Sequence, residues 1–325
     1  MKFLLDANGL DDGSSVVIDA GRMAREKLGI DITIIGKADI EDAVIKSGCK
    51  FLLASEDIST DEHNPAFAIR NKKDSSITKG LYALKKGEYD AFISGGSTGA
   101  VFAGASLIVG RIPGVDRAAL MVPVPTVKGF SYMIDAGANV DCTPEMLKNF
   151  AIIASNYVKL IKNVEHPSVM LINNGIEESK GTALTRETYK LLKESDLNFK
   201  GNLEARYIFD GEADIIVTDG FSGNLLLKGF EGEFRFVLKL LKDTAYTNIF
   251  TKLGMLLIKK YLKNNFKKLD ANQYGGVPIM GLKKVVVKAH GNSNAEAFYN
   301  SIKVAKETYE SNLIEYLTNL FQTEV

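Results

Sequence analysis

Short apolar runs alternate along this chain with longer amphipathic stretches, and this alternation restricts its fold more than any other feature. Most of the runs end in Gly, Asp, Ser or Asn, as strands of a parallel sheet do where they enter loops. The pattern predicts one α/β domain over residues 1–325, with a largely parallel sheet and helices on both faces. The expected strands are Lys2–Ala7, Ile30–Ile35, Phe51–Ala54, Asp90–Ser94, Ala118–Val122, Ser131–Asp135, Ser168–Ile172, Asp214–Thr218 and Val285–Ala289, and the expected helices include Ser14–Leu28, Pro144–Lys162, Thr182–Glu194 and Ala295–Tyr316.

The composition fits a globular protein of the reducing cytoplasm. Of the 325 residues, 46% are hydrophobic and 25% are charged, which is ordinary for such proteins. Lys+Arg and Asp+Glu number 40 each, so the net charge is zero, which argues against nucleic acid as a partner. The two cysteines, Cys49 and Cys142, exclude a disulfide framework. The start of the chain lacks the apolar core of a signal peptide, and no apolar run is long enough to cross a membrane.

One strongly basic stretch interrupts the α/β pattern. Residues 233–268 carry nine Lys and Arg against two acidic side chains, so the net charge of the stretch is +7. Apolar residues at helical spacing predict two cationic amphipathic helices joined near Tyr246–Asn248, as an arm over residues 230–269. Two interpretations stay open. The pair packs inside the protein or in a dimer, or it lies on anionic lipid, where each cation contributes about 1 kcal/mol.

Fingerprints of common cofactors are absent from the sequence. There is no G-x-G-x-x-G after a predicted strand, no G-x-x-x-x-G-K-[ST], no G-x-S-x-G and no H-E-x-x-H. The three histidines lie far apart along the chain. The sequence therefore predicts neither a nucleotide cofactor nor a metal, and the loops at the strand ends become the candidates for chemistry.

The loop Gly95–Ala100, between a predicted strand and a helix, is a candidate phosphate cradle. Glycine lets the backbone approach an anion, the helix start offers N–H groups, and Ser97 and Thr98 add hydroxyl donors. The alternative is a tight connection with no ligand. Upstream, the cations of Arg70–Ser76 form either an anion funnel or the solvated end of a helix.

Three further loops, at 135–142, 219–224 and 288–294, follow predicted strands and carry Asn, Asp and Gly. Ligands of doubly wound sheets bind at the carboxyl ends of strands, so we expect these loops to converge on one polar pocket. Cys142 has no histidine nearby in sequence and is predicted to be an inert thiol. His290, beside Lys288, either faces the pocket or packs as a structural histidine.

Seven segments of the chain also match a known pattern as a set. They are Arg70–Ser76, Gly96–Ala100, Gly110–Arg117, Asp135–Cys142, Asp219–Asn224, Tyr274–Gly276 and Lys288–Asn294. Together, and in this order, they resemble the bacterial phosphate acyltransferase (PlsX) family over nearly the whole chain.

The resemblance implies a three-layer α/β/α sandwich related to isocitrate and isopropylmalate dehydrogenases and to phosphotransacetylases. It implies a homodimer that converts fatty acyl-[acyl carrier protein] and inorganic phosphate into acyl phosphate and free carrier protein, without a cofactor. The family serves phospholipid synthesis and associates peripherally with the membrane. That association favours the lipid interpretation of the 230–269 arm.

Two loops depart from the family pattern. The family's Asp-Ala-Met-Gly-Gly-Asp-His-Ala-Pro reads Asp-Ala-Asn-Gly-Leu-Asp-Asp-Gly at residues 6–13. The acidic loop after the strand Ser168–Ile172 is altered over residues 173–181 but keeps Lys180-Gly181. If the first loop contacts phosphate or pantetheine, substrate preference or activity changes with it.

The candidate site follows from the reaction that the resemblance implies. Phosphate is already an anionic nucleophile, so attack on a thioester needs positioning and charge neutralisation rather than a strong base or an acyl-enzyme. We expect donors to the thioester oxyanion from Lys180, Asn224, Lys288 and His290. Substrate binding is expected from Asp6, Gly9, Arg70, Lys72, Lys73, Gly96, Ser97, Thr98, Gly99, Asn139, Asp219, Ser293 and Asn294.

Three alternative functions remain at this point. A short-chain acyl-CoA phosphotransacylase shares the chemistry but needs no lipid arm. A decarboxylating NAD-linked dehydrogenase shares the fold class but lacks a supporting nucleotide loop here. A non-catalytic protein that binds acyl chains or membrane is favoured only by the altered loop at residues 6–13.

Overall fold

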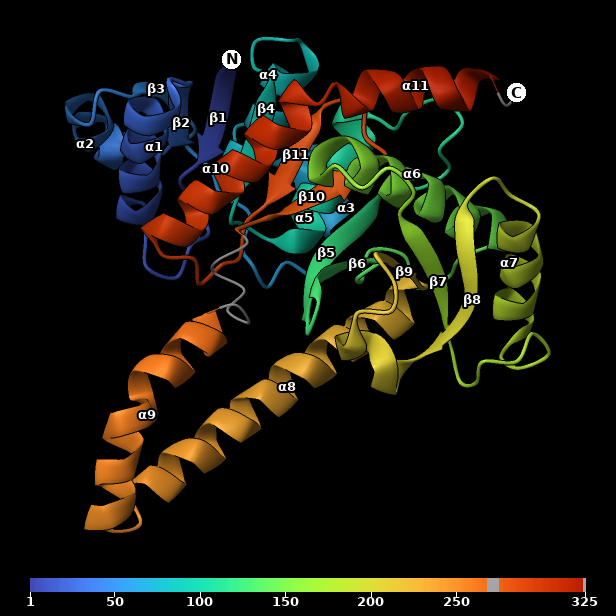
Figure 1. The fold of residues 1–325 in the computed structure, drawn as a ribbon. Helices are drawn as coiled ribbons and strands as arrows, with labels where there is room; N and C mark the ends of the chain where they lie inside the picture. The colour runs from blue at the N-terminus through green and yellow to red at the C-terminus, as the bar shows by residue number, and fades with distance from the viewer. Residues whose placement is uncertain (268–274, 324–325) are drawn as a thin grey trace.

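The computed structural model describes residues 1–267 and 275–323, and it has a mixed α/β fold (Figure 1). Its described strands form one 11-stranded sheet. In spatial order the strands are β3 (Lys50–Leu53), β2 (Asp31–Gly36), β1 (Lys2–Asp6), β4 (Ala91–Ser94), β11 (Val285–Lys288), β10 (Val277–Met280), β5 (Ala119–Thr126), β6 (Gly129–Ile134), β9 (Ile215–Val217), β7 (Ser168–Asn173) and β8 (Asn198–Glu204).

The sheet consists of two parallel blocks that run in opposite directions. Strands β3, β2, β1, β4 and β11 are mutually parallel and form the first block. Strands β6, β9, β7 and β8 are mutually parallel and form the second block. Between the blocks, β10 is antiparallel to β11 and to β5, and β5 is antiparallel to β6. The carboxyl ends of the two blocks therefore lie at opposite edges of the sheet.

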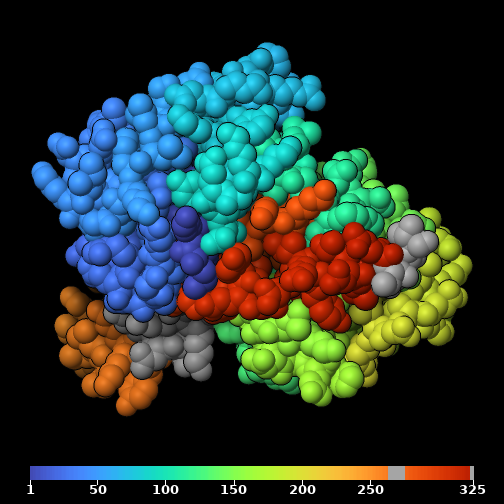
Figure 2. Space-filling view, turned by 90° about the horizontal axis from the view of Figure 1, so that it is seen from above, coloured from blue at the N-terminus to red at the C-terminus, as the bar shows by residue number. Residues whose placement is uncertain are grey.

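The two sets of strand ends are named after their buried aspartates. The carboxyl ends of β1, β4 and β11 form the Asp6 edge, and the carboxyl ends of β6, β9 and β7 form the Asp135 edge. Seen from above, the first-block elements (blue) and the second-block elements (yellow) lie at opposite ends of the body, with the C-terminal helices (red) between them (Figure 2). The prediction of a largely parallel sheet holds within each block. The expectation that all strand ends share one edge is wrong.

Helices cover both faces of the sheet because the strands alternate their apolar side chains. Phe3 and Leu5 face one side and Leu4 the other, and all three are fully buried. The Phe3 side is covered by α1 (Ser15–Leu28), α2 (Glu41–Lys46), α6 (Pro144–Lys162), α7 (Ala183–Lys193), α10 (Ala295–Glu310) and α11 (Leu313–Thr323). The Leu4 side is covered by α3 (Pro65–Asn71), α4 (Ser76–Lys85), α5 (Thr98–Gly104) and the first half of α8 (Gly220–Ala245).

Two long helices project from the body, joined at the predicted turn (Figure 1). They are α8, of 26 residues, and α9 (Ile249–Lys267). The first begins ten residues before the predicted start at 230, because Asp219 caps it and it continues without a break into the arm. Among the described residues, no helix is both long and apolar enough to cross a bilayer. Residues 268–269 of the predicted arm, and Tyr274, lie outside the described residues.

Three local predictions need correction. Strands β8 and β10 were not expected, since β8 is polar and Pro278 in β10 disfavours a central strand. The helix predicted over Ala295–Tyr316 is two helices, because Asn312 adopts a left-handed φ of 53° between α10 and α11.

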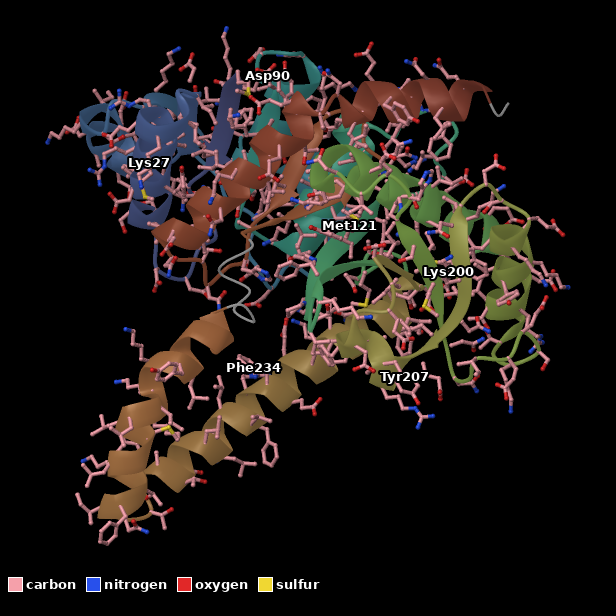
Figure 3. All side chains as sticks on the ribbon, viewed as in Figure 1. Lys27, Asp90, Met121, Lys200, Tyr207 and Phe234 are labelled. Atoms are coloured by element: carbon pink, nitrogen blue, oxygen red, sulfur yellow. The ribbon has the colours of Figure 1, made fainter. Side chains whose placement is uncertain are left out.

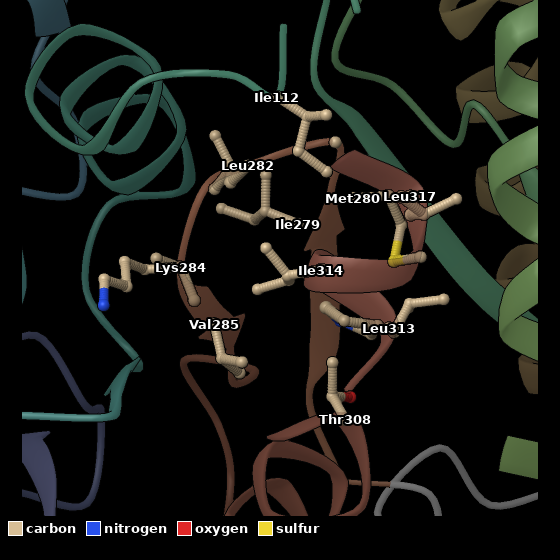
Figure 4. Close-up of a pocket in the computed structure, with 13 residues that line it drawn as sticks. Ile112, Ile279, Met280, Leu282, Lys284, Val285, Thr308, Leu313, Ile314 and Leu317 are labelled. Carbon is tan, nitrogen blue, oxygen red and sulfur yellow. The ribbon is translucent and has the colours of Figure 1, made fainter. Parts of the chain in front are cut away.

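Where α10 and α11 meet β10 and β11, an apolar cavity of about 20 Å³ remains, lined by side chains such as Ile279 and Ile314 (Figure 4). It is a packing void rather than a ligand site.

Candidate active site

The Asp6 edge holds a buried carboxylate. Asp6, the last residue of β1, is fully buried, and it accepts hydrogen bonds from Ser94 Oγ (2.6 Å) and the Asn8 backbone N–H (3.0 Å). Burial raises the pKa of Asp6, and these hydrogen bonds oppose that rise. Asn8 also donates through its side chain to Ser76 Oγ at the start of α4 (3.3 Å). The Asp6 carboxyl is therefore fixed in place by its neighbours.

A buried lysine lies two strands away, at the end of β11. Lys288 is 8% exposed, and its Nζ donates to the carbonyl oxygens of Gly95 (3.3 Å) and Ala289. Burial lowers the pKa of Lys288 to about 8, against the opposing charge of Asp6. Burial and the Lys288 charge also lower the pKa of His290, which favours a neutral imidazole at physiological pH. A buried cation thus acts on Asp6 through its charge, and His290 lies within electrostatic reach of that cation.

Close contacts between glycines hold these loops together. A Cβ at Gly9 (φ +82°) would lie 2.6 Å from Gly96 Cα, so only glycine fits where the loops after β1 and β4 touch. The Asp11 N–H donates to the Gly291 carbonyl at 2.9 Å, which ties in the loop after β11. The structure therefore brings together five of the predicted site residues: Asp6, Gly9, Gly96, Lys288 and His290.

The predicted phosphate cradle lies at the same edge, next to α3. Ser97 caps α5 by accepting from the Ala100 N–H (3.4 Å), while Thr98 is exposed. A Cβ at Gly99 would lie 2.8 Å from Pro65, so the cradle packs against the helix that carries Arg70.

The three predicted cations upstream of the cradle differ in how they are used. Lys72 Nζ donates to the Asp57 carbonyl (2.9 Å), and Lys73 Nζ lies 5.9 Å from the ring centre of Tyr82. Arg70 is exposed and has no ion-pair partner among the described residues. Arg70 is thus the cation of this segment that is most available to an anion.

The Asp135 edge is also built around a buried carboxylate, but its partners are different. Asp135 is fully buried and accepts five hydrogen bonds, which come from the Leu120, Gly137, Ala138 and Asn139 backbone and from the Asn139 side chain. Asn139 Nδ2 also donates to the Ala118 carbonyl (2.8 Å). The Asn139 amide, predicted to bind substrate, is therefore occupied in holding its own loop.

Asp219 and Asn224 lie beside this loop, at the start of α8. Asp219 caps the helix by accepting from the N–H and hydroxyl of Ser222, both at 2.8 Å. A Cβ at Gly223 would lie 2.0 Å from the Asp135 carbonyl oxygen, so α8 packs directly on the loop. Asn224 is exposed and lies against Gly137. Lys180, on the loop after β7, is also exposed at this edge.

The expectation of one convergent pocket stays a prediction, because no hydrogen bond or ion pair among the described residues joins the two clusters. Lys180, Asn139, Asp219 and Asn224 follow strands of the second block, whereas Lys288 and His290 lie at the end of β11 in the first block, which runs in the opposite direction. Helix α8 connects the two edges. Lys228 and Glu231, further along it, act on the pKa of His290 through their charges.

Other predicted residues have roles within the fold. Ser293 is buried, and its N–H donates to the His290 carbonyl (3.2 Å); Asn294 caps α10 by accepting from the Ala297 N–H (2.9 Å). Burial raises the pKa of Cys142 to about 11, in keeping with an inert thiol.

The sequence analysis did not predict that Ser94, Asn8 and Ser76 belong to the site around Asp6. The only signal for Ser94 was its place as the last residue of a predicted strand.

Comparison with known proteins places this chain. A family model described as "Fatty acid synthesis protein" matches residues 1–316. The chain belongs to this family. A "Phosphate acyltransferase" from Thermoanaerobacterium thermosaccharolyticum is 43% identical over 98% of this chain and 96% of its own length. A protein of the same name from Clostridium beijerinckii is 42% identical over the full length of both chains.

Solved structures similar to this fatty acid synthesis family member share its fold. A phosphotransacetylase from Streptococcus pyogenes has a TM-score of 0.60 at 21% identity, covering 97% of this chain and 94% of its own. The EutD phosphotransacetylase from Staphylococcus aureus also scores 0.60, at 15% identity and 94% of each chain. A 4-hydroxythreonine-4-phosphate dehydrogenase from Klebsiella pneumoniae scores 0.52 at 10% identity, covering 95% of this chain and 97% of its own.

Proposed function

We propose that this chain is a phosphate acyltransferase that moves a fatty acyl group from the thioester of acyl carrier protein to inorganic phosphate. The observation that carries the proposal is the 43% identity, over nearly the full length of both chains, to a relative named phosphate acyltransferase. The Asp6 edge supports it, because a buried ammonium among glycine-lined loops suits a reaction of phosphate.

The chemistry follows from the groups at the Asp6 edge. Phosphate binds near Lys288 and the exposed Arg70, and one of its oxygens attacks the thioester carbonyl carbon. The new C–O bond forms, the C–S bond breaks, and the thiolate leaves with the carrier protein. Lys288 neutralises the developing oxyanion and, with a pKa of about 8, can pass a proton to the leaving sulfur.

Lys180 and Asn224 take part through a second copy of the chain in this proposal. They follow strands that run opposite to β11, and in the proposed homodimer they meet Lys288 of the partner. An exposed stripe on α8 supports such a dimer. Phe221 and Leu225 are 61% and 64% exposed, and Gly229 and Gly232, one and two turns further on, leave open space for a second backbone.

Mixed dimers test this shared site. Lys180→Ala and Lys288→Ala are each expected to be inactive alone. After the two variants are unfolded and refolded together in equal amounts, random pairing restores one intact site in half of the dimers, or about a quarter of wild-type activity. Two inactive variants that stay inactive when mixed, although they form dimers, would contradict the shared site but not the acyl transfer.

The arm is proposed to hold the protein on an anionic membrane. On α9, Phe250 and Leu257 are 81% and 79% exposed, and the surrounding helices carry the excess of lysines. We expect the protein to sediment with vesicles that contain phosphatidylglycerol and the Phe250→Ser/Leu257→Ser variant to stay in solution. A Leu53→Ser control, at an exposed position on β3, should sediment as the wild type does.

The activity itself is tested by phosphate-dependent release of thiol from palmitoyl-[acyl carrier protein], with acyl phosphate identified as the product. Turnover would also establish that the altered loop at residues 6–13 is tolerated. Turnover of short acyl-CoA alone would favour the second candidate, a phosphotransacylase, to which the fold similarity to phosphotransacetylases lends support. No turnover of either substrate by folded protein would refute both.

A further inference from the structure

A groove on the Phe3 side of the sheet belongs to neither edge cluster. It has a volume of about 190 Å³ and lies where α6 and α10 separate over the middle of the sheet. Figure 3 labels Met121, which lies on its floor, between the ribbons of these two helices. The groove is lined by Met121, Pro123, Tyr132, Tyr157, Lys162, Gly276, Pro278, Asn300, Lys303, Val304 and Glu307.

Two tyrosine hydroxyls in this groove have no protein partner. Tyr157 is only 2% exposed, and neither its hydroxyl nor that of Tyr132 makes a hydrogen bond within the described part of the chain. The two rings pack at 5.7 Å between centres. Burial raises the pKa of both, to about 12 for Tyr132, so both remain protonated and able to donate. Neither hydroxyl is among the fully buried polar atoms that lack a partner, so both hydroxyls face the open space of the groove and can donate to a ligand or water there.

The charged side chains of the groove include one lysine more than they can pair with a carboxylate. Glu307 is already paired with Lys162 at 2.9 Å. Lys303 has no carboxylate within ion-pair distance among the described residues, and its Nζ lies 5.1 Å from the ring centre of Tyr299. The remaining walls are apolar, formed by Met121, Pro123, Pro278 and Val304. The groove thus combines unpaired hydrogen-bond donors with a short apolar surface.

We propose that this groove binds a small organic oxyanion with a short hydrocarbon chain. Tyr132, Tyr157 and Lys303 donate to the oxyanion, and the chain lies against the two prolines and Met121. A carboxylate and a phosphate monoester share this chemistry. The site is independent of the proposed acyl transfer, because its ligand-binding side chains come from β6, α6 and α10 and not from the loops at either edge.

Calorimetric titration with four six-carbon probes tests the proposal. Hexanoate and hexyl phosphate distinguish the two anion classes, and at least one of them should bind. Hexanol and hexylammonium, which carry the same chain without a negative charge, should not. Binding of hexanol as tight as that of both anions, or no binding of any probe, would overturn the proposal.

Variants locate the binding. Tyr157→Phe and Lys303→Gln should each weaken anion binding by about tenfold or more, as expected for a lost hydrogen bond to a charged group. The melting temperature of Tyr157→Phe should not fall, because its hydroxyl has no partner to lose. Tyr189→Phe on α7 and Lys306→Gln on α10, which do not line the groove, are the matched controls. Unchanged affinity in both groove variants would place the anion elsewhere and reject the site.

Discussion

The Asp6 edge and the Asp135 edge present the same features in sequence but use them differently. Each has a fully buried aspartate at the end of a strand, followed by a glycine-bearing loop. Asp135 accepts all five of its hydrogen bonds from its own loop and from Leu120, whereas Asp6 is held by Ser94 and faces the buried Lys288. A carboxylate saturated by backbone donors is structural. One that shares its environment with a desolvated cation is equipped for chemistry.

The largest expected effect is on turnover at the Asp6 edge. Lys288→Met keeps most of the side-chain volume but removes the ammonium that balances phosphate and the oxyanion. Loss of such electrostatic stabilisation is expected to lower kcat by about 10²–10³-fold. Steady-state thiol release measures the change, and thermal melting checks the fold. A variant that kept full turnover would remove the Asp6 edge from the reaction.

Substitution of Asp135 should lower the stability of the protein rather than its turnover. Asp135→Asn places an amide N–H₂ among donors that need an acceptor, so we expect a loss of about 2–4 kcal/mol in the free energy of unfolding. Urea denaturation measures it. The KM for phosphate in the surviving folded enzyme should change little. A phosphate-specific rise in KM without loss of stability would contradict the structural role that separates the two edges.

Sequence patterns located the elements of this comparison but not its geometry. Each predicted strand exists, and the helix predicted over Pro144–Lys162 has those bounds in the structure. The reversal between blocks went unseen because it depends on β10, whose proline resembles a loop, and on the turn Val127–Lys128, which lacks the Asn-Gly or Asp-Gly signal of a hairpin. Placing Lys180 opposite Lys288 requires strand direction, which depends on contacts distant in sequence rather than on local propensity.

Alanine variants of two glycines with the same backbone conformation distinguish the effect of a lost loop contact from the effect of backbone strain. Gly9 (φ +82°) touches Gly96, whereas Gly13 (φ +80°) has nothing within 4 Å of its would-be Cβ. Both alanine variants incur the left-handed strain, about 1 kcal/mol. Only Gly9→Ala must also displace the loop after β4, so it should lose about 1–2 kcal/mol more and reduce turnover. Chemical denaturation and the thiol assay compare the two, and equal losses would mean that the Gly9–Gly96 contact is dispensable.

The smallest effect is a pH dependence that only the Asp6 edge should produce. Because the Lys288 pKa is lowered to about 8, the ammonium needed for phosphate is lost as pH rises through that value, and kcat/KM should fall by up to about tenfold per pH unit above it. Stability should move the other way. Between about pH 8 and 10.5 the unfolded chain binds the Lys288 proton and the folded chain does not, so this residue contributes increasing stability as pH rises. Lys288→Met should lose both trends. An alkaline loss of activity that persists in Lys288→Met would assign the titration to another group and leave the buried lysine as a fixed element of the fold.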